Sequence, residues 1–376
     1  MQSTRVWFAE TFKPLQLVLE DSKIIEIAEH GKYKSGVDYA NAMILPGLID
    51  IHAHGYYGNS CNHATADWLA KWMAYLPTEG VTGVLATTSS VEEKTLLSSM
   101  EVIAKAMDKP LGGAQILGIN AEGPLLNPTY KGAQALECLA LPSPAIIDKY
   151  RKATSEKLRY LCIAVEMDED LKATKYAYEK GISIAIGHSD ASLSLCKQAM
   201  KAGASSFVHT FNAMPPLNHR NPGPVGAAMY LEEAYAEVIG DGLHVDFSVV
   251  NILGKLKGKD RLILVSDSAN GKGLPAGDYK LPGRHIVMGE DGTCRLFSSD
   301  TLAGGTGKMN EMLYNLIYKA KLDQVAAINA ATCNPLQMLG LAKEKGYLKV
   351  GYDADITILD KDFSVLQTFV QGIKQL

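Results

Sequence analysis

The segment "PGLIDIHAHG", residues 46–55, places two histidines at the end of an apolar run. His52 and His54 are separated by one residue. Because the side chains of a β-strand alternate between its two faces, both imidazoles leave the same face. A pair of hydrogen-bonded surface histidines is one explanation of this pattern, and a metal site is the other. The rest of the chain has to decide between them.

Apolar, strand-like runs recur along the chain and alternate with helical patterns. Trp68, Leu69, Trp72, Met73 and Leu76, for example, fall on one helical stripe. Eight strands with interleaved helices predict a closed parallel (β/α)8 barrel. An open doubly wound sheet is the alternative, but no GxGxxG motif opens its first helix. The eight runs are residues 43–54, 81–89, 114–123, 158–167, 181–189, 204–212, 236–244 and 260–269.

The two ends of the chain have a different character. Residues 1–45 and 344–376 contain short strand-like pieces broken at turn residues. We therefore expect a small, discontinuous β-sandwich domain built from both termini, beside a catalytic barrel formed by residues 46–343. The segment 272–305 is rich in glycine and proline, which indicates a loop or hairpin after the last barrel strand.

Composition narrows the class of protein. The chain has 376 residues, of which 47% are hydrophobic, and a net charge of -4, so no broad basic surface for nucleic acid is expected. Its six cysteines are scattered without a CxxC pair, which predicts reduced thiols in the cytoplasm. We expect no membrane association, because no signal-peptide pattern opens the chain and no apolar run approaches the length of a membrane span.

Ionisable residues stand near the ends of most predicted strands. In a parallel barrel the carboxyl ends of all strands open onto one mouth, so these residues should converge there. A single histidine at a strand end is commonly structural, but this repetition favours a functional site. Imidazoles and carboxylates together suit zinc, iron or manganese. The cluster consists of His52, His54, Glu122, His188, His209, His244 and Asp267, and we predict that it holds a catalytic divalent metal, one or two ions per chain, with zinc favoured.

At these residues the chain resembles the N-acetylglucosamine-6-phosphate deacetylases of the amidohydrolase superfamily, over essentially its whole length. The resemblance implies a (β/α)8 barrel with an appended β domain. It also implies hydrolysis of the acetamide of a phosphorylated amino sugar, usually by a homodimer. "HTFNAMPP" together with "GDGLHVD" is the most specific pair. The matching segments are "LPGLIDIHAHG", "AEGPLLNPTYKGA", "GHSDA", "HTFNAMPPLNHRNPG", "GDGLHVD", "VSDS" and "TLAGG".

The resemblance also implies roles for individual residues. Glu122, His188 and His209 fall on the principal metal ligands, and His52 and His54 match a pair that some members use for a second metal. Asp267 falls on the catalytic aspartate, which would take a proton from water and deliver it to the leaving amine. Arg220 and His244 would help to bind the sugar phosphate. The substrate-contacting positions are Ala133, Gln134, Asn212, Ala213, Arg220, His244, Leu302, Ala303 and Gly304.

Two departures from the family pattern bear on the substrate. Gln134 stands where the family usually has a histidine facing the acetyl carbonyl; an amide can donate a hydrogen bond there but cannot carry a proton. The segment that begins with Asp267 also differs, reading "DSANGKGLPAG". The alternatives are therefore a deacetylase of another N-acetyl sugar phosphate, such as the galactosamine epimer, a cyclic amidase, or a catalytically silent sugar-phosphate-binding protein. Asp267 and the complete ligand set argue against a silent protein.

Overall fold

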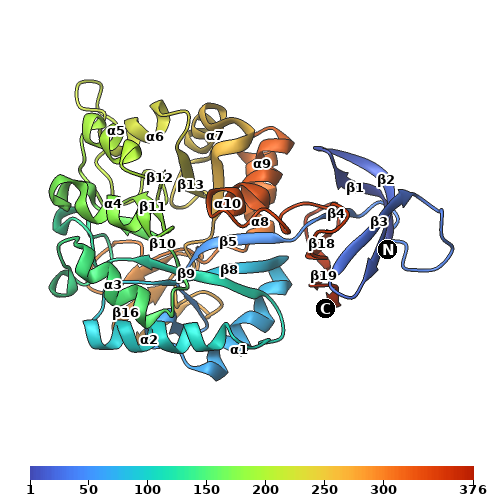
Figure 1. The fold of residues 1–376 in the computed structure, drawn as a ribbon, viewed down its shortest axis with the longest axis horizontal. Helices are drawn as coiled ribbons and strands as arrows, with labels where there is room; N and C mark the ends of the chain where they lie inside the picture. Colours follow the sequence, from blue (N-terminus) through green and yellow to red (C-terminus); the bar gives the residue numbers. More distant parts are fainter.

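Eight parallel strands form the centre of the molecule in the computed structural model, which describes residues 1–376 (Figure 1). Each strand pairs with the next one along the chain, from β5 to β14. This order confirms the predicted barrel and excludes the doubly wound sheet. The strands are β5 (Leu48–Ala53), β8 (Val81–Thr88), β9 (Gln115–Glu122), β10 (Leu158–Ile163), β11 (Ser183–Ile186), β12 (Ala204–Phe207), β13 (Tyr235–Ile239) and β14 (Leu262–Val265).

The barrel closes where its last strand meets its first. The backbone N–H of Asp267 donates to the carbonyl of His52 at 2.8 Å, and the N–H of His54 donates to the carbonyl of Ser268 at 2.9 Å. Below them, the Ser266 hydroxyl donates to the buried Asp50 carboxylate. The seam therefore fixes both histidines of the opening segment against the end of the last strand.

Helices surround the barrel (Figure 1). In the first, the Thr65 side chain accepts the N–H of Trp68, and the predicted stripe is buried at Trp68, Leu69, Trp72 and Met73. No helix is both long enough and apolar enough to cross a membrane. The helices are α1 (Ala66–Tyr75), α2 (Glu93–Ala106), α3 (Pro144–Ala153), α4 (Lys172–Glu179), α5 (Leu193–Lys201), α6 (Gly223–Tyr230), α7 (Phe247–Arg261), α8 (Met309–Tyr314), α9 (Gln324–Ala331) and α10 (Cys333–Met338).

Strands from both ends of the chain form one seven-stranded sheet beside the barrel, and both termini lie in it (Figure 1). β4 joins the two halves, pairing in parallel with β1 and antiparallel with β18. The seven strands share one continuous hydrogen-bonded order, β20-β19-β18-β4-β1-β2-β3. They are β1 (Gln2–Phe8), β2 (Thr11–Glu20), β3 (Lys23–Glu29), β4 (Met43–Pro46), β18 (Ile356–Leu359), β19 (Val365–Val370) and β20 (Ile373–Lys374).

The first predicted strand, residues 43–54, is divided in the structure at Gly47. Residues before it belong to the terminal sheet as β4, and residues after it enter the barrel as β5. A side chain at this position would collide with Thr82, whose Oγ1 lies 2.1 Å from where a Cβ would stand. The close approach of Thr82 therefore requires glycine where the chain leaves one sheet for the other.

The segment 272–305 has more structure than the loop or hairpin that we predicted. It folds into a three-stranded antiparallel sheet of β15 (Gly277–Leu281), β16 (Arg284–Met288) and β17 (Cys294–Leu296). A small apolar core that includes Ile286 and Cys294 supports this sheet. Glycines between the strands hid this regularity in the sequence. The sheet brings Arg284 to the mouth of the barrel.

A buried ion pair connects the segment after β14 to the barrel wall. Lys272 Nζ lies 2.8 Å from Glu79 Oε2, and both side chains are almost fully buried. Glu79 belongs to the 3-10 turn η2 (Leu76–Glu79), and the same oxygen accepts the N–H of Met309 at the start of α8. One carboxylate therefore fastens three separate segments.

Replacing Lys272 by methionine should destabilise the protein by about 3–5 kcal/mol, because the Glu79 carboxylate would stay buried without its charged partner. Urea unfolding monitored by circular dichroism measures this. The matched control is Lys308→Met, since Lys308 forms a longer, exposed pair with Glu311 and should cost less than about 1 kcal/mol. Equal costs for the two variants would contradict the proposed importance of the buried pair.

Candidate metal centre

Six side chains from five parts of the chain meet at the carboxyl ends of the barrel strands. His52 belongs to β5 and Glu122 ends β9, whereas His188, His209 and Asp267 each lie two residues beyond a strand. The last three have positive φ angles of 48°, 21° and 47°. Non-glycine residues in this region carry about 1–3 kcal/mol of strain each, and such strain is concentrated at functional sites.

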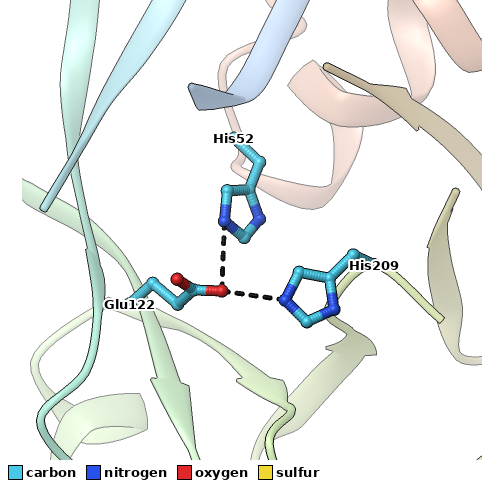
Figure 2. A group of neighbouring side chains, drawn as sticks. All are labelled: His52, Glu122 and His209. Carbon is cyan, nitrogen blue, oxygen red and sulfur yellow. Dashed lines mark hydrogen bonds and ion pairs between the residues drawn. The ribbon is translucent and has the colours of Figure 1, made fainter. Parts of the chain in front are cut away.

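The carboxylate of Glu122 is the centre of the cluster. Its Oε1 lies 2.8 Å from His209 Nε2 and 3.0 Å from His188 Nε2. The same oxygen lies 3.3 Å from His52 Nε2, and Figure 2 shows His52 and His209 converging on it from different sides. Oε2 lies 3.3 Å from His54 Nε2. All four histidines predicted as metal ligands therefore face one carboxylate.

Asp267 joins the cluster from the opposite side of the barrel seam. Its Oδ1 lies 3.2 Å from His54 Nε2 and 3.7 Å from His52 Nε2. The ligand atoms of His52, His54 and Asp267 all lie within 4.8 Å of one another, as do those of His52, Glu122 and His209. His52 thus stands between two groups of three donors.

The electrostatics of the cluster are those of closely packed opposite charges. Burial alone would raise the pKa of Glu122, but the facing His188 and His52 rings outweigh it and hold that pKa well below its usual range. Burial likewise opposes ionisation of Asp267, yet contact with His54 and the charge of His52 lower its pKa to about 2. Burial would lower the pKa of His52, but Glu237 and Glu122 raise it. The carboxylates are therefore ionised and need positive partners.

The donor set fits a divalent transition metal. It offers imidazole nitrogens and carboxylate oxygens without thiolates, which is the ligand class of catalytic zinc, iron and manganese sites. His52 Nε2 is buried and close to two carboxylates, but it is not aligned for a hydrogen bond with either. A metal bound at these nitrogens takes the place of protons, so the imidazoles would ligate in their neutral form.

A second layer of residues holds the first. The Gln134 amide donates to Glu122 Oε2 at 2.6 Å, and its carbonyl accepts the N–H of Ser90. His188 Nδ1 faces the carbonyl of Tyr130 at 2.8 Å. One amide hydrogen of Gln134 therefore binds Glu122, and its oxygen binds Ser90 and holds the side chain in place. The sequence did not indicate this positioning role.

A cavity of about 250 Å³ opens above the cluster. His244 lines it, and Asp241 Oδ2 holds the Nδ1 of that ring at 2.6 Å, while its Nε2 has no partner. Every residue predicted to contact substrate lines the cavity except Arg220, which is exposed on the loop before α6. The lining also includes Ala133, Gln134, Asn212, Ala213, Leu302, Ala303 and Gly304.

Sequence reasoning missed three charged residues of this region. Arg284 lines the cavity from β16, and the only hydrogen bond of its side chain is a long one of 3.4 Å to Ser89. Asp241 could have been found, because it stands three residues before His244 in the same loop. Glu237 is a single carboxylate within the apolar strand β13. Only its complete burial in the structure indicates that it has a specific role.

Comparisons of the sequence and of the structure with known proteins agree on one family. The amidohydrolase family model matches residues 43–374. The chain is 34% identical to an N-acetylglucosamine-6-phosphate deacetylase of Bacillus subtilis, over 89% of this chain and 84% of that protein. It is 32% identical to an N-acetylgalactosamine-6-phosphate deacetylase of Escherichia coli O157:H7, over 88% and 87%. The crystal structure of N-acetyl-D-glucosamine-6-phosphate deacetylase from Mycobacterium smegmatis matches with a TM-score of 0.94 at 27% identity, covering 100% of this chain and 99% of that one.

Proposed function

This chain belongs to the N-acetylglucosamine-6-phosphate deacetylases of the amidohydrolase family, and we propose that it hydrolyses N-acetylglucosamine 6-phosphate to glucosamine 6-phosphate and acetate. The observation that carries this proposal is the convergence of four imidazoles and two carboxylates beneath a cavity of about 250 Å³. A mutant of the mycobacterial enzyme has been solved in complex with the same sugar phosphate.

We propose that Glu122, His188 and His209 hold one metal ion and that His52, His54 and Asp267 complete a second position, with Glu122 between the two. When bound, such a metal lowers the pKa of water and polarises a carbonyl group. Zinc is favoured, with iron and manganese as alternatives. All six cysteines are unpaired, which supports a reducing compartment, and we place the enzyme in the cytoplasm.

The remaining chemistry falls to the side chains around the cavity. Asp267 is ionised and can accept a proton from the attacking water, then return it to the amine as the amide bond breaks. His244 Nε2 is free to bind a substrate oxygen, since Asp241 already holds the other ring nitrogen. Gln134 already donates one of its two amide hydrogens to Glu122, so its main contribution is to fix that carboxylate. The second hydrogen can bind the acetyl oxygen of the substrate.

Two further parts of the proposal concern organisation. Residues 46–343 form the catalytic barrel domain, and residues 1–45 with 344–376 form the small β domain. Arg220 lies outside the cavity of its own chain, so we propose a homodimer in which it reaches the sugar phosphate from the partner. Arginine suits that task because its planar fork can bind two phosphate oxygens.

The substrate is tested by acetate release. Metal-loaded protein is assayed with the N-acetyl derivatives of glucosamine and galactosamine, each with and without the 6-phosphate, and again after chelation. We expect the phosphorylated glucosamine derivative to give the highest kcat/KM. A higher value for the galactosamine epimer would favour the second candidate, which the Escherichia coli relative motivates. No acetate from any sugar would contradict the proposal.

Replacing Asp267 by asparagine should lower kcat by about 10²–10⁴-fold, because the proton acceptor is lost while the shape is kept. Metal content measured by elemental analysis should stay close to that of the parent, because the asparagine keeps a carbonyl oxygen where Asp267 offers a ligand atom. The matched control is Asp190→Asn, an exposed aspartate after β11 that should leave turnover unchanged. A variant at position 267 with near-parent turnover would assign proton transfer elsewhere.

Replacing His52 and His54 together by asparagine should remove about one ion per chain and leave some activity. The reason is that Glu122, His188 and His209 can still hold a metal and activate water. Elemental analysis against the fully loaded parent gives the ratio, and exposed His219→Asn is the control. An unchanged ratio would mean that the two histidines only support a single-metal centre.

Replacing Arg220 by alanine should reduce kcat/KM at least about tenfold for the phosphorylated sugar and much less for the unphosphorylated one. A hydrogen bond to a charged group contributes about 1.5–3 kcal/mol. Arg284→Met is the comparison variant, because Arg284 lines the cavity within one chain. A phosphate-selective loss in the Arg284 variant alone would move the anchor to that residue, and equal losses on both sugars would exclude Arg220.

A further inference from the structure

A carboxylate that none of the roles above uses lies directly behind the metal cluster. Glu237 belongs to β13 and is completely buried. Burying an ionised carboxylate is expensive unless hydrogen bonds or charges compensate it. Its partners therefore indicate what the residue does.

The two oxygens of Glu237 face different neighbours. Oε2 lies 2.9 Å from His52 Nδ1 and accepts the backbone N–H of His209 at 3.0 Å. Oε1 accepts the hydroxyl of Tyr160 at 2.7 Å, which in turn pairs with Ser206. One oxygen thus contacts two residues of the candidate metal centre, and the other contacts the barrel interior.

The contact with His52 determines which nitrogen of that ring can ligate. A carboxylate only accepts hydrogen bonds, so the proton of a neutral His52 must stand on Nδ1. The lone pair is then on Nε2, which faces Glu122 at 3.3 Å and Asp267 at 3.7 Å. Carboxylates behind ligating histidines fix ring orientation and increase ligand basicity.

Among the four candidate histidine ligands, His52 alone is held from behind by a carboxylate. His188 Nδ1 faces a backbone carbonyl, and the Nδ1 atoms of His54 and His209 have no hydrogen-bond partner. His52 also belongs to both groups of three donors. A residue that controls His52 therefore acts where the two groups meet.

We propose that Glu237 is a positioning residue that fixes the tautomer and ring orientation of His52 and thereby sets the affinity of the metal ion that His52 binds. This inference rests on the proposed metal centre. A purely structural role is the competing explanation, because Glu237 also anchors Tyr160 in the barrel interior. The two explanations differ in whether the effect passes through His52.

A double-mutant cycle separates them. Metal-free parent, Glu237→Gln, His52→Asn and the double variant are titrated with Co²⁺, and binding is followed by visible absorption. We expect Glu237→Gln to weaken the ion that His52→Asn also weakens, by about 10–100-fold. The double variant should bind no more than about twofold weaker than His52→Asn alone, since removing the intermediary removes the effect.

Tyr160→Phe is the matched control. It deletes the other hydrogen bond to the same carboxylate but leaves the contact with His52, so Co²⁺ affinity should equal that of the parent. If Glu237→Gln does not fold, Glu237→Asp keeps the charge and withdraws it from His52 by one methylene, with the same expected direction. Urea unfolding of each metal-free variant gives the folding control.

Additive losses in the cycle, parent-like binding by Glu237→Gln, or an equal loss in Tyr160→Phe would each overturn the positioning role. If the parent itself binds no Co²⁺, the proposed metal centre fails and this inference fails with it. If the parent binds Co²⁺, His52→Asn binds it more weakly and the Glu237 variants bind it as tightly as the parent, then the metal centre stands and the inference alone is wrong.

Discussion

A single buried charge constrains the rest of this structure. The Glu122 carboxylate lies at the end of β9 with almost no access to water, and an ion in that position must be surrounded by compensating groups. Those groups are imidazoles that arrive from β5 and from the loops after β11 and β12. Their convergence requires the barrel to close with its strand ends at one level. The backbone bonds between His52 and Asp267 provide that closure, so the seam of the fold and the candidate metal centre are the same place.

The barrel could be predicted from the sequence because its signals are local. Each strand is an apolar run, and most end in a residue that is costly to bury without a function. The terminal sheet was harder, because β4 and β5 follow each other directly in the sequence, and only the structure shows that they divide at Gly47, against which Thr82 packs. Strands β15 to β17 were missed for the opposite reason. They are short and separated by glycine-containing turns, and their regularity comes from pairing with one another.

The site was predictable to the extent that its residues follow strands. All six candidate ligands come together, but Gln134 and Arg220 show the limit of carrying roles over by position. Gln134 faces Glu122 because the loop after β9 folds back on Ser90. Arg220 lies on an exposed loop, and a single chain does not show which residues of a partner subunit would lie near it. Glu237 gives no periodic signal, since its partners His52 and Tyr160 come from distant strands. Long-range polar contacts of this kind become visible only once the strand order is known.

The position of β4 in the terminal sheet has a consequence for biosynthesis. β1 to β4 leave the ribosome before the barrel does, yet β4 pairs with β18, and residues 47–355, which include all eight barrel strands, lie between them. The small core of that sheet also draws on Leu348, Ile356 and Ile358 from the far end of the chain. Until those residues emerge, one edge of β4 has no partner, and unpaired edges invite association with other chains. The nascent protein must therefore carry an incomplete sheet while the barrel is being translated, and strands made before the barrel are among the last to become native.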